Sequence, residues 1–184
     1  MKIMILGGCG YIGTTLVEKL LEQNYTLVVV DIQWFGNYLK KNKNLEIKKK
    51  DIRNLEFKDF KNISTIIHLA NIANDPAVEL NQNLSWEVNV LATQQISDLA
   101  IRAGVKNFIY ASSGSVYGIK KEDKVTEDLQ LVPLSTYNKT KMVAERILFS
   151  HQNNMKIYCI RPATVCGYSS RMRLDLTVNM LTMQ

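Results

Sequence analysis

The chain alternates short apolar runs with longer amphipathic segments. The apolar runs are rich in β-branched residues, as strands are, and they lie at 2–6, 26–30, 45–47, 65–69, 107–111 and 156–160. Apolar residues repeat at helical spacing over 11–23 and 84–102. Alternating strands and helices predict an α/β protein with a parallel sheet and crossover helices. The continuous apolar run at 27–30 predicts strands buried on both faces.

Local signals mark the ends of these elements. Ser135 precedes a helical segment as a candidate N-cap, and Pro133 ends the loop before it. Gly104 is placed to end the long helix before the strand at 107. Residues 171–184 show the apolar pattern of an opening helix that stops without a cap. We therefore predict one domain over 1–170 and the start of a truncated C-terminal region over 171–184.

Composition adds few constraints. The 184 residues are 46% hydrophobic and 22% charged, which is ordinary for one soluble globular domain. No apolar run approaches the roughly 20 residues that span a bilayer, so we expect a cytoplasmic protein with no membrane partner. The three cysteines, Cys9, Cys159 and Cys166, suggest neither a metal site nor a disulfide framework.

The net charge of +6 comes largely from lysines, and several of these lie between residues 40 and 50. These lysines have no interleaved aromatic residues, which argues for a solvated face rather than a track for nucleic acid. We predict no nucleic-acid partner. A basic surface also suits an anionic small substrate such as a nucleotide sugar.

The glycine-rich segment 7–13 follows an apolar strand and opens a helix. In this context glycines let the backbone approach a pyrophosphate, and the helix N-terminus offers free amide hydrogens. The alternative is a turn that only packs strand against helix. The candidate cofactor-binding residues here are Gly7, Gly10, Tyr11, Ile12 and Gly13.

Asp31 ends the second predicted strand, 18 residues after Gly13. This is close to the spacing at which an acidic residue meets the adenosine ribose of NAD. A 2′-phosphate would be repelled by this carboxylate, and Ile32 and Gln33 supply no arginine, so NAD is favoured over NADP. Two alternatives stay open: Asp31 could only cap the strand end, and the lysines at 40–41 could still accommodate NADP.

Tyr137 and Lys141 lie four residues apart on a predicted helix, with Ser113 upstream. A phenol is a poor base at neutral pH, since its unperturbed pKa is about 10. A lysine on the same helix face favours the phenolate, and a bound oxidised nicotinamide adds a second positive charge. This constellation predicts acid–base chemistry beside a nicotinamide. Alone, the pair could be an ordinary surface pair on a helix.

Taken in order, these motifs resemble those of the extended short-chain dehydrogenase/reductase family, specifically its NAD-dependent nucleotide-sugar epimerase/dehydratase group. The series covers essentially the whole chain: Gly7 to Gly13, Asp31, Asp51-Ile52-Arg53, His68-Leu69-Ala70, Asn89, Ser112 to Gly118, Tyr137 to Lys141, and Arg161-Pro162. The resemblance implies a Rossmann-type doubly wound sheet with helices on both faces. It also implies a homodimer and a longer protein, whose C-terminal substrate domain is largely missing here, so that this chain could bind NAD without turning over substrate.

The resemblance assigns roles to individual residues. It implies that Tyr137 is the acid/base, that Lys141 lowers its pKa and binds the nicotinamide ribose, and that Ser113 orients the reacting hydroxyl. Asp51 and Ile52 would contact the adenine. Four further residues would line the site: Leu69 and Ala70 for the cofactor, Ser115 and Thr164 for the substrate.

One departure from the family bears on the reaction. Dehydratases of the family usually carry an Asp-Glu pair after the catalytic Ser or Thr, where this chain has Gly114-Ser115. We therefore expect a nucleoside-diphosphate-sugar epimerase, such as a 4-epimerase, that works through a transient keto sugar. The alternatives are a dehydratase or keto-sugar reductase of the same family, or a non-catalytic NAD-binding module.

Overall fold

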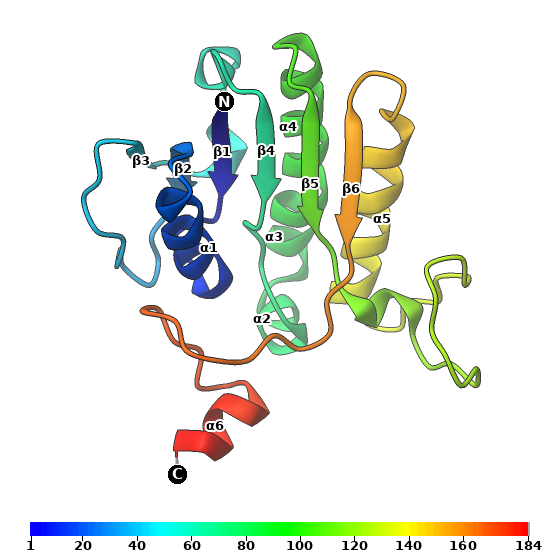
Figure 1. Cartoon of the computed structure of the whole chain (residues 1–184). Coiled ribbons are helices and arrows are strands. Elements are labelled where there is room, and N and C mark those ends of the chain that lie inside the picture. The colour runs from blue at the N-terminus through cyan, green and yellow to red at the C-terminus, as the bar shows by residue number, and fades with distance from the viewer. Residues whose placement is uncertain (184) are drawn as a thin grey trace.

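The structure, a computed structural model that describes residues 1–183, is built on six parallel strands in the order β3-β2-β1-β4-β5-β6 (Figure 1). Their bounds are β1 Lys2–Leu6, β2 Thr26–Asp31, β3 Leu45–Lys49, β4 Thr65–His68, β5 Asn107–Ala111 and β6 Lys156–Ile160. All six predicted strands are present. The order is that of the doubly wound dinucleotide-binding fold, so the predicted fold class is confirmed.

The order in which successive strands are added to the sheet reverses beside β1. β1 pairs with β2 on one side, from Lys2 opposite Thr26, and with β4 on the other, from Ile3 opposite Thr65. Ligands of open parallel sheets bind outside the carboxyl ends of the strands at such a switch point. The carboxyl ends of β1, β2 and β4 are therefore where a cofactor site is expected.

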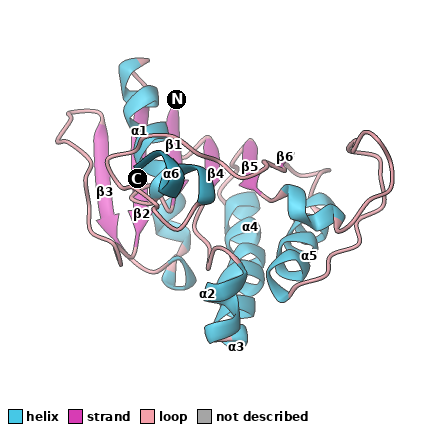
Figure 2. Ribbon diagram, turned by 90° about the horizontal axis from the view of Figure 1, so that it is seen from below, coloured by secondary structure: helices cyan, strands magenta, loops and turns pink. Residues whose placement is uncertain are grey.

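Helices cover both faces of the sheet (Figure 2). α1 (Tyr11–Glu22) packs on one face, where Val17 lies with Ile3, Ile5 and the inward residues of β2. The other face carries α4 (Ala92–Arg102) and α5 (Thr136–Ser150). There Ile96 and Leu148 join the alternate residues of β1 and β2. The strands are thus buried from both sides, as their continuous apolar runs require.

The helix before α4 is longer than its periodicity suggested. α2 (Asp75–Leu80) and α3 (Gln82–Trp86) precede a π-helical turn at Glu87–Leu91, which continues into α4. Asn89 lies in this turn, and its amide binds both backbone groups of Ile72. Single π-helical turns of this kind are frequent at functional sites.

The predicted helix ends are present. The Ser135 hydroxyl accepts a hydrogen bond from the backbone amide of Asn138 at 3.2 Å, which makes Ser135 the N-cap of α5. Gly104 follows α4 with φ +75°, a conformation that glycine adopts without strain. Both local signals therefore act as the sequence indicated.

The C-terminal helix begins later than predicted. α6 spans Thr177–Met183, whereas we expected a helix from residue 171. Residues 167–176 instead cross the carboxyl edge of the sheet as a loop (Figure 1). The Ser169 hydroxyl holds this loop to the backbone carbonyl of Tyr11 at 2.8 Å, a tertiary contact that periodicity does not reveal. Residue 184 lies outside the described part.

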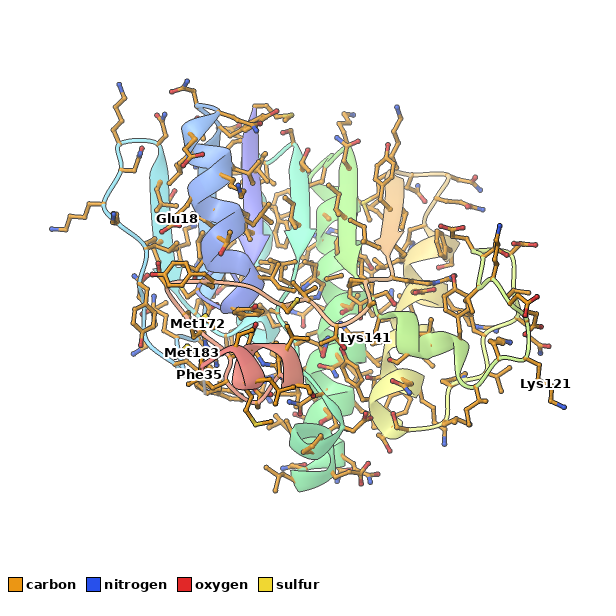
Figure 3. The ribbon with its side chains drawn as sticks, turned by 60° about the horizontal axis from the view of Figure 1, so that its bottom comes forward. Glu18, Phe35, Lys121, Lys141, Met172 and Met183 are labelled. Carbon is orange, nitrogen blue, oxygen red and sulfur yellow. The ribbon has the colours of Figure 1, made fainter. Side chains whose placement is uncertain are left out.

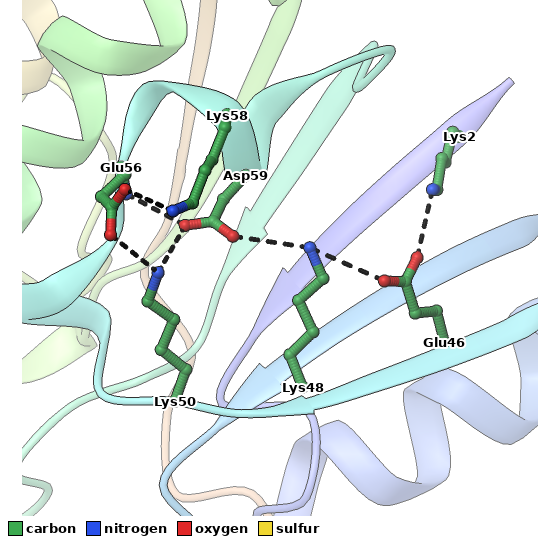
Figure 4. A network of polar contacts seen from close by, with 7 residues as sticks. All are labelled: Lys2, Glu46, Lys48, Lys50, Glu56, Lys58 and Asp59. Atoms are coloured by element: carbon green, nitrogen blue, oxygen red, sulfur yellow. Dashed lines mark hydrogen bonds and ion pairs between the residues drawn. The ribbon is translucent and has the colours of Figure 1, made fainter.

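Several of the lysines at the β3 edge are paired with acids. Lys48 and Lys50 reach the largely buried Asp59 at 3.5 and 2.7 Å, and Glu46 links Lys48 to Lys2 (Figure 4). The nearby pair Glu56–Lys58 extends the same network. Charged side chains on an edge strand also discourage pairing with other sheets. The lysines at 48 and 50 thus serve the fold of this edge.

In residues 1–183, no helix is both long and apolar enough to cross a membrane. Within the same range, His, Cys, Asp and Glu side chains form no group of three that could hold a metal ion.

Candidate active site

The glycine turn after β1 is packed directly against the end of β4. Gly7 has φ +81°, and a Cβ added there would lie 2.5 Å from the Ala70 nitrogen. A Cβ at Gly13 would lie 2.5 Å from the Gly7 carbonyl oxygen. Gly10 differs, because its nearest obstacle is that same oxygen at 3.2 Å, and it faces an open cavity. Gly7 and Gly13 are fixed by packing, whereas Gly10 leaves room for a ligand.

This cavity lies at the switch point of the sheet. Its walls come from the glycine turn, from the loop after β2, from residues 51–53, and from the segment after β4. Seven of the predicted cofactor residues line it: Gly7, Gly10, Asp31, Asp51, Ile52, Leu69 and Ala70. Sequence positions from 7 to 70 are thus brought together on one concave surface.

Asp31 is held in place by backbone donors. Its carboxylate accepts hydrogen bonds from the Cys9 amide at 2.9 Å and from the Gln33 amide at 2.6 Å. Each carboxylate oxygen keeps accepting capacity for a further donor such as a ribose hydroxyl. Burial and the Asp31 charge raise the pKa of the Cys9 thiol to about 12, so this cysteine is a packing residue in the turn.

Asp51 belongs to a chain of charges on the opposite wall. Arg53 donates to Asp51 Oδ1 from Nε at 3.2 Å and to Asp51 Oδ2 from Nη2 at 2.8 Å, and its Nη1 reaches Glu87 at 2.9 Å. The Arg53 hydrogen bonds hold the pKa of Asp51 below its ordinary value. Asp51 is therefore an ionised acceptor whose orientation is fixed.

The loop after β2 adds an aromatic wall that the motif analysis missed. Trp34 and Phe35 line the cavity and are still 59% and 63% exposed. The guanidinium of Arg171 lies 4.0 Å from the centre of the Phe35 ring, within cation–π range. Two large aromatic residues that follow an acidic residue at a strand end could have been recognised in the sequence as part of a binding site. Arg171, 136 positions after Phe35, gives no such signal in the sequence.

Arg171 also bears on the choice between NAD and NADP. The residues directly after Asp31 supply no arginine. The fold brings in Arg171 from the loop before α6, close enough for the Asp31 charge to raise its pKa, although burial lowers that pKa overall.

Tyr11 and Ile12 do not line this cavity. The Tyr11 hydroxyl donates to the Gly167 carbonyl at 2.6 Å and accepts from the Asn179 amide at 3.0 Å. Ile12 is 40% exposed and borders a separate hollow beside the loop after β6. The side chain of Tyr11 thus joins the glycine turn to α6, while its backbone opens α1.

The predicted catalytic residues gather at the carboxyl end of β5. The Lys141 ammonium donates to the Ala111 carbonyl at 2.6 Å and lies 5.8 Å from the centre of the Tyr137 ring. The hydroxyls of Ser113 and Ser115 are 2.7 Å apart, and the Ser115 hydroxyl donates a hydrogen bond to the side-chain oxygen of Asn138. Thr164 lies exposed in the loop after β6. Figure 3 shows Lys141, which belongs to α5, well to the right of Phe35.

Burial shifts both pKa values of the Tyr-Lys pair. It lowers the pKa of Lys141 to about 7, against the opposing charges of Glu145 and Cys159. It raises the pKa of Tyr137, although the Ser113 side chain acts in the opposite direction. The protein alone therefore does not produce the lowered Tyr137 pKa that helix spacing suggested. A further positive charge near Tyr137 is needed to favour its phenolate.

A buried ion pair holds α5 to β6 beneath these residues. Arg161 donates to the 1% exposed Glu145 carboxylate at 2.7 and 3.0 Å and to the Tyr117 hydroxyl at 2.8 Å. These bonds raise the pKa of Arg161 further. Arg161 was part of the sequence motif, but its partner Glu145 was not identified. Glu145 follows Lys141 by one helical turn, so it fixes the helix that carries the Tyr-Lys pair.

Comparison with known proteins identifies the class. Residues 3–182 match the model of the NAD dependent epimerase/dehydratase family. The chain therefore belongs to this NAD-dependent family, as the motif series predicted.

Individual relatives are similar over most of this chain. A putative UDP-glucose 4-epimerase of Methanocaldococcus jannaschii is 32% identical over 90% of the chain and 56% of that protein. The structure of Bacillus cereus UDP-glucuronic acid 4-epimerase with UDP-glucuronic acid and NAD is 29% identical, with a TM-score of 0.85 over 99% of this chain and 63% of that one. The NDP-hexosamine 5,6-dehydratase TunA of tunicamycin biosynthesis is 26% identical, with a TM-score of 0.88 over 98% and 59%.

These similarities cover only part of each relative. The chain spans about half the length of the curated relatives it matches, from 41% to 62%. The named relatives include epimerases and a dehydratase, so they define the family and leave the reaction of this chain to be tested.

Proposed function

We propose that this chain binds NAD in the cavity at the switch point and carries the acid–base residues of a nucleoside-diphosphate-sugar epimerase that works through a transient keto sugar. The observation that supports this most directly is the cavity itself. Seven residues selected from sequence motifs line it, and Gly10 leaves room there that no packing requires. Asp31 presents a fixed carboxylate at its β2 side.

In this proposal each residue near β5 has a defined task. When bound, NAD supplies a hydride acceptor and a positive charge. Tyr137 then takes the proton of the sugar hydroxyl, Ser113 orients that hydroxyl, and Lys141 binds the ribose next to the nicotinamide. Ser115 and Thr164 contact the substrate. The raised pKa of Tyr137 keeps it protonated until the cofactor is present.

An epimerase is favoured over a dehydratase by the turn after Ser113. A Cβ at Gly114 would lie 3.3 Å from the Pro162 carbonyl oxygen, a tight contact, at the position where family dehydratases carry an acid. The Ser115 hydroxyl is bound to Ser113 and Asn138. This turn thus holds hydroxyl groups suited to orientation rather than a carboxyl pair suited to removing water.

Cofactor binding is tested first, because Trp34 is a built-in reporter. The chain has two tryptophans, and Trp86→Phe leaves Trp34 alone in the cavity wall. We expect NAD to change its fluorescence with 1:1 stoichiometry, and calorimetry on the unmodified chain to give the same affinity. A chain that binds no NAD in either assay contradicts the proposal.

The reaction is tested with NAD and a panel of nucleotide sugars, followed by mass and proton NMR. An unchanged mass with one inverted ring carbon supports the epimerase. Loss of one water identifies a dehydratase, and consumption of NADH with a keto sugar identifies a reductase. Bound NAD without turnover of any sugar favours the NAD-binding module, or a chain that needs the missing part of its relatives.

Tyr137→Phe separates chemistry from binding. We expect turnover to fall by about 10²–10⁴-fold, because the proton acceptor is lost, while the affinity for NAD changes less than about threefold. Stopped-flow and calorimetry measure the two quantities. The matched control is Tyr158→Phe. Tyr158 lies on β6, is half exposed and does not line the cavity, so this substitution should change neither turnover nor NAD affinity.

A further inference from the structure

Buried polar atoms without partners concentrate near one edge of the sheet. Among the described residues, the unpartnered buried side-chain atoms belong to His68, Asn71, Tyr110 and Ser112, at or just after the carboxyl ends of β4 and β5. Asn71 stands apart from the other three in two ways. Both its amide nitrogen and its amide oxygen lack a partner, and it alone lines the cavity.

The backbone around Asn71 is firmly held. On one side the amides of Leu69 and Ala70 both donate to the Leu6 carbonyl at 2.8 Å. On the other side the Ile72 amide donates to Asn89 Oδ1 at 2.9 Å. The backbone on both sides of the unpartnered Asn71 amide is therefore fixed.

Asn89, by contrast, has a side-chain amide with a structural role. Its side chain binds the Ile72 amide, the Ile72 carbonyl at 3.2 Å and the Thr140 hydroxyl at 3.2 Å. A buried amide without partners opposes folding, and such groups are rare in native structures. An amide kept in that state on a ligand cavity is accounted for when the ligand supplies the partners.

We propose that Asn71 is a further cofactor-binding residue, an inference that rests on the proposed NAD site. Its side-chain amide donates a hydrogen bond to a ribose hydroxyl of the dinucleotide and accepts one from it. A phosphate oxygen could satisfy only the NH₂ group, since it accepts hydrogen bonds. A hydroxyl can both donate and accept, so it matches the two unpartnered atoms. None of the sequence motifs includes this residue.

The test compares the ligand-free stability and the NAD affinity of matched variants. Asn71→Ala removes the amide without filling the cavity, and Asn71→Leu replaces it with an apolar side chain of similar volume. We expect both to weaken NAD binding about tenfold, the effect of two neutral hydrogen bonds. The melting temperature of the ligand-free variants should stay the same or rise, whereas Asn89→Ala should lower it.

Two outcomes overturn the inference. One is an NAD affinity within twofold of the unmodified chain in the Ala variant. The other is a ligand-free melting temperature that falls as far as that of Asn89→Ala, which would make Asn71 structural. Failure of the unmodified chain to bind NAD would instead refute the proposed function, so the two failures are distinguishable.

Discussion

At the β1–β2 end of the carboxyl edge, the cavity is shaped by backbone: a glycine turn packed on β4, and a carboxylate held by two amides. At the β5–β6 end, the site is formed by side chains, and burial opposes the charged form of two of them. Lys141 is buried with a pKa near 7, and Tyr137 has a raised pKa. The backbone of the first region is already in place without a ligand. The second requires a charge that the chain does not supply.

The largest expected effect tests whether the β5–β6 end depends on its buried ion pair. Glu145→Ala leaves the Arg161 charge largely buried without its partner, which should cost about 3–5 kcal/mol of unfolding free energy. Urea denaturation measures this. The matched control Glu22→Ala, at the exposed end of α1, should cost less than about 0.5 kcal/mol. Equal effects of the two substitutions would show that the ion pair does not hold α5.

The next test separates packing from ligand space in the glycine turn. Gly13→Ala places a Cβ 2.5 Å from a backbone oxygen and 2.7 Å from the Gly8 Cα, so the turn must move. We expect a loss of roughly 3 kcal/mol in stability.

Gly10→Ala is the comparison for that variant. Its Cβ meets one atom at 3.2 Å, so stability should change by less than about 1 kcal/mol, while NAD affinity falls at least tenfold. Thermal melting and calorimetry of both variants decide the matter. A Gly10→Ala protein that binds NAD normally would contradict the assignment of that space to the cofactor.

Lys141→Met should stabilise the ligand-free chain. The folded pKa of Lys141 is about 7 against an ordinary 10.5, so between these values the unfolded state holds the proton more tightly. The unfolding free energy of the unmodified chain therefore rises from pH 7 toward pH 10. At pH 7 and below, it falls furthest short of that of the Lys141→Met variant. We expect a gain of about 1–3 kcal/mol at pH 7, with NAD affinity reduced.

Chemical denaturation across pH 6–10 checks this prediction. The variant should lose the rise between pH 7 and 10, while Lys139→Met, exposed on the same helix, should keep it. A variant less stable than the unmodified chain at pH 7 would show that Lys141 supports the fold.

The smallest expected effect concerns the rim of the cavity. Arg171→Gln removes the cation from the Phe35 ring, a contact worth about 0.5–1 kcal/mol at an exposed site. NAD affinity should fall by about two- to fivefold. The same measurement with NADP shows whether Arg171 offsets Asp31: NADP affinity should fall more than NAD affinity if it does, and equally if it does not.

Much of the fold followed from the sequence, because strands buried on both faces leave continuous apolar runs. The glycine turn and Asp31 were identified for a related reason: backbone constraints act at fixed spacing. The start of α6, the partner of Arg161 and the position of Arg171 were missed. Each depends on contacts between segments distant in the chain, such as Ser169 with Tyr11, and local patterns carry no record of them.

The pKa of Tyr137 shows the same limit at the site. Helix spacing correctly placed Lys141 one turn after Tyr137, but it could not reveal that the ammonium turns to the Ala111 carbonyl. Nor could it reveal that burial outweighs the neighbouring charges. Proximity along a helix was predictable, whereas the local dielectric environment was not.

The sheet order also has a consequence for synthesis on the ribosome. Every residue that lines the cavity lies between Gly7 and Val88, whereas the acid–base cluster needs α5 and the ion pair needs Arg161. The strand before the glycine turn, β1, remains unpaired on one side until β4 has emerged, because Ile3 pairs with Thr65. All residues of the cavity lining are therefore synthesised before α5 and Arg161, and since a domain generally folds as a unit, they await the second half of the sheet.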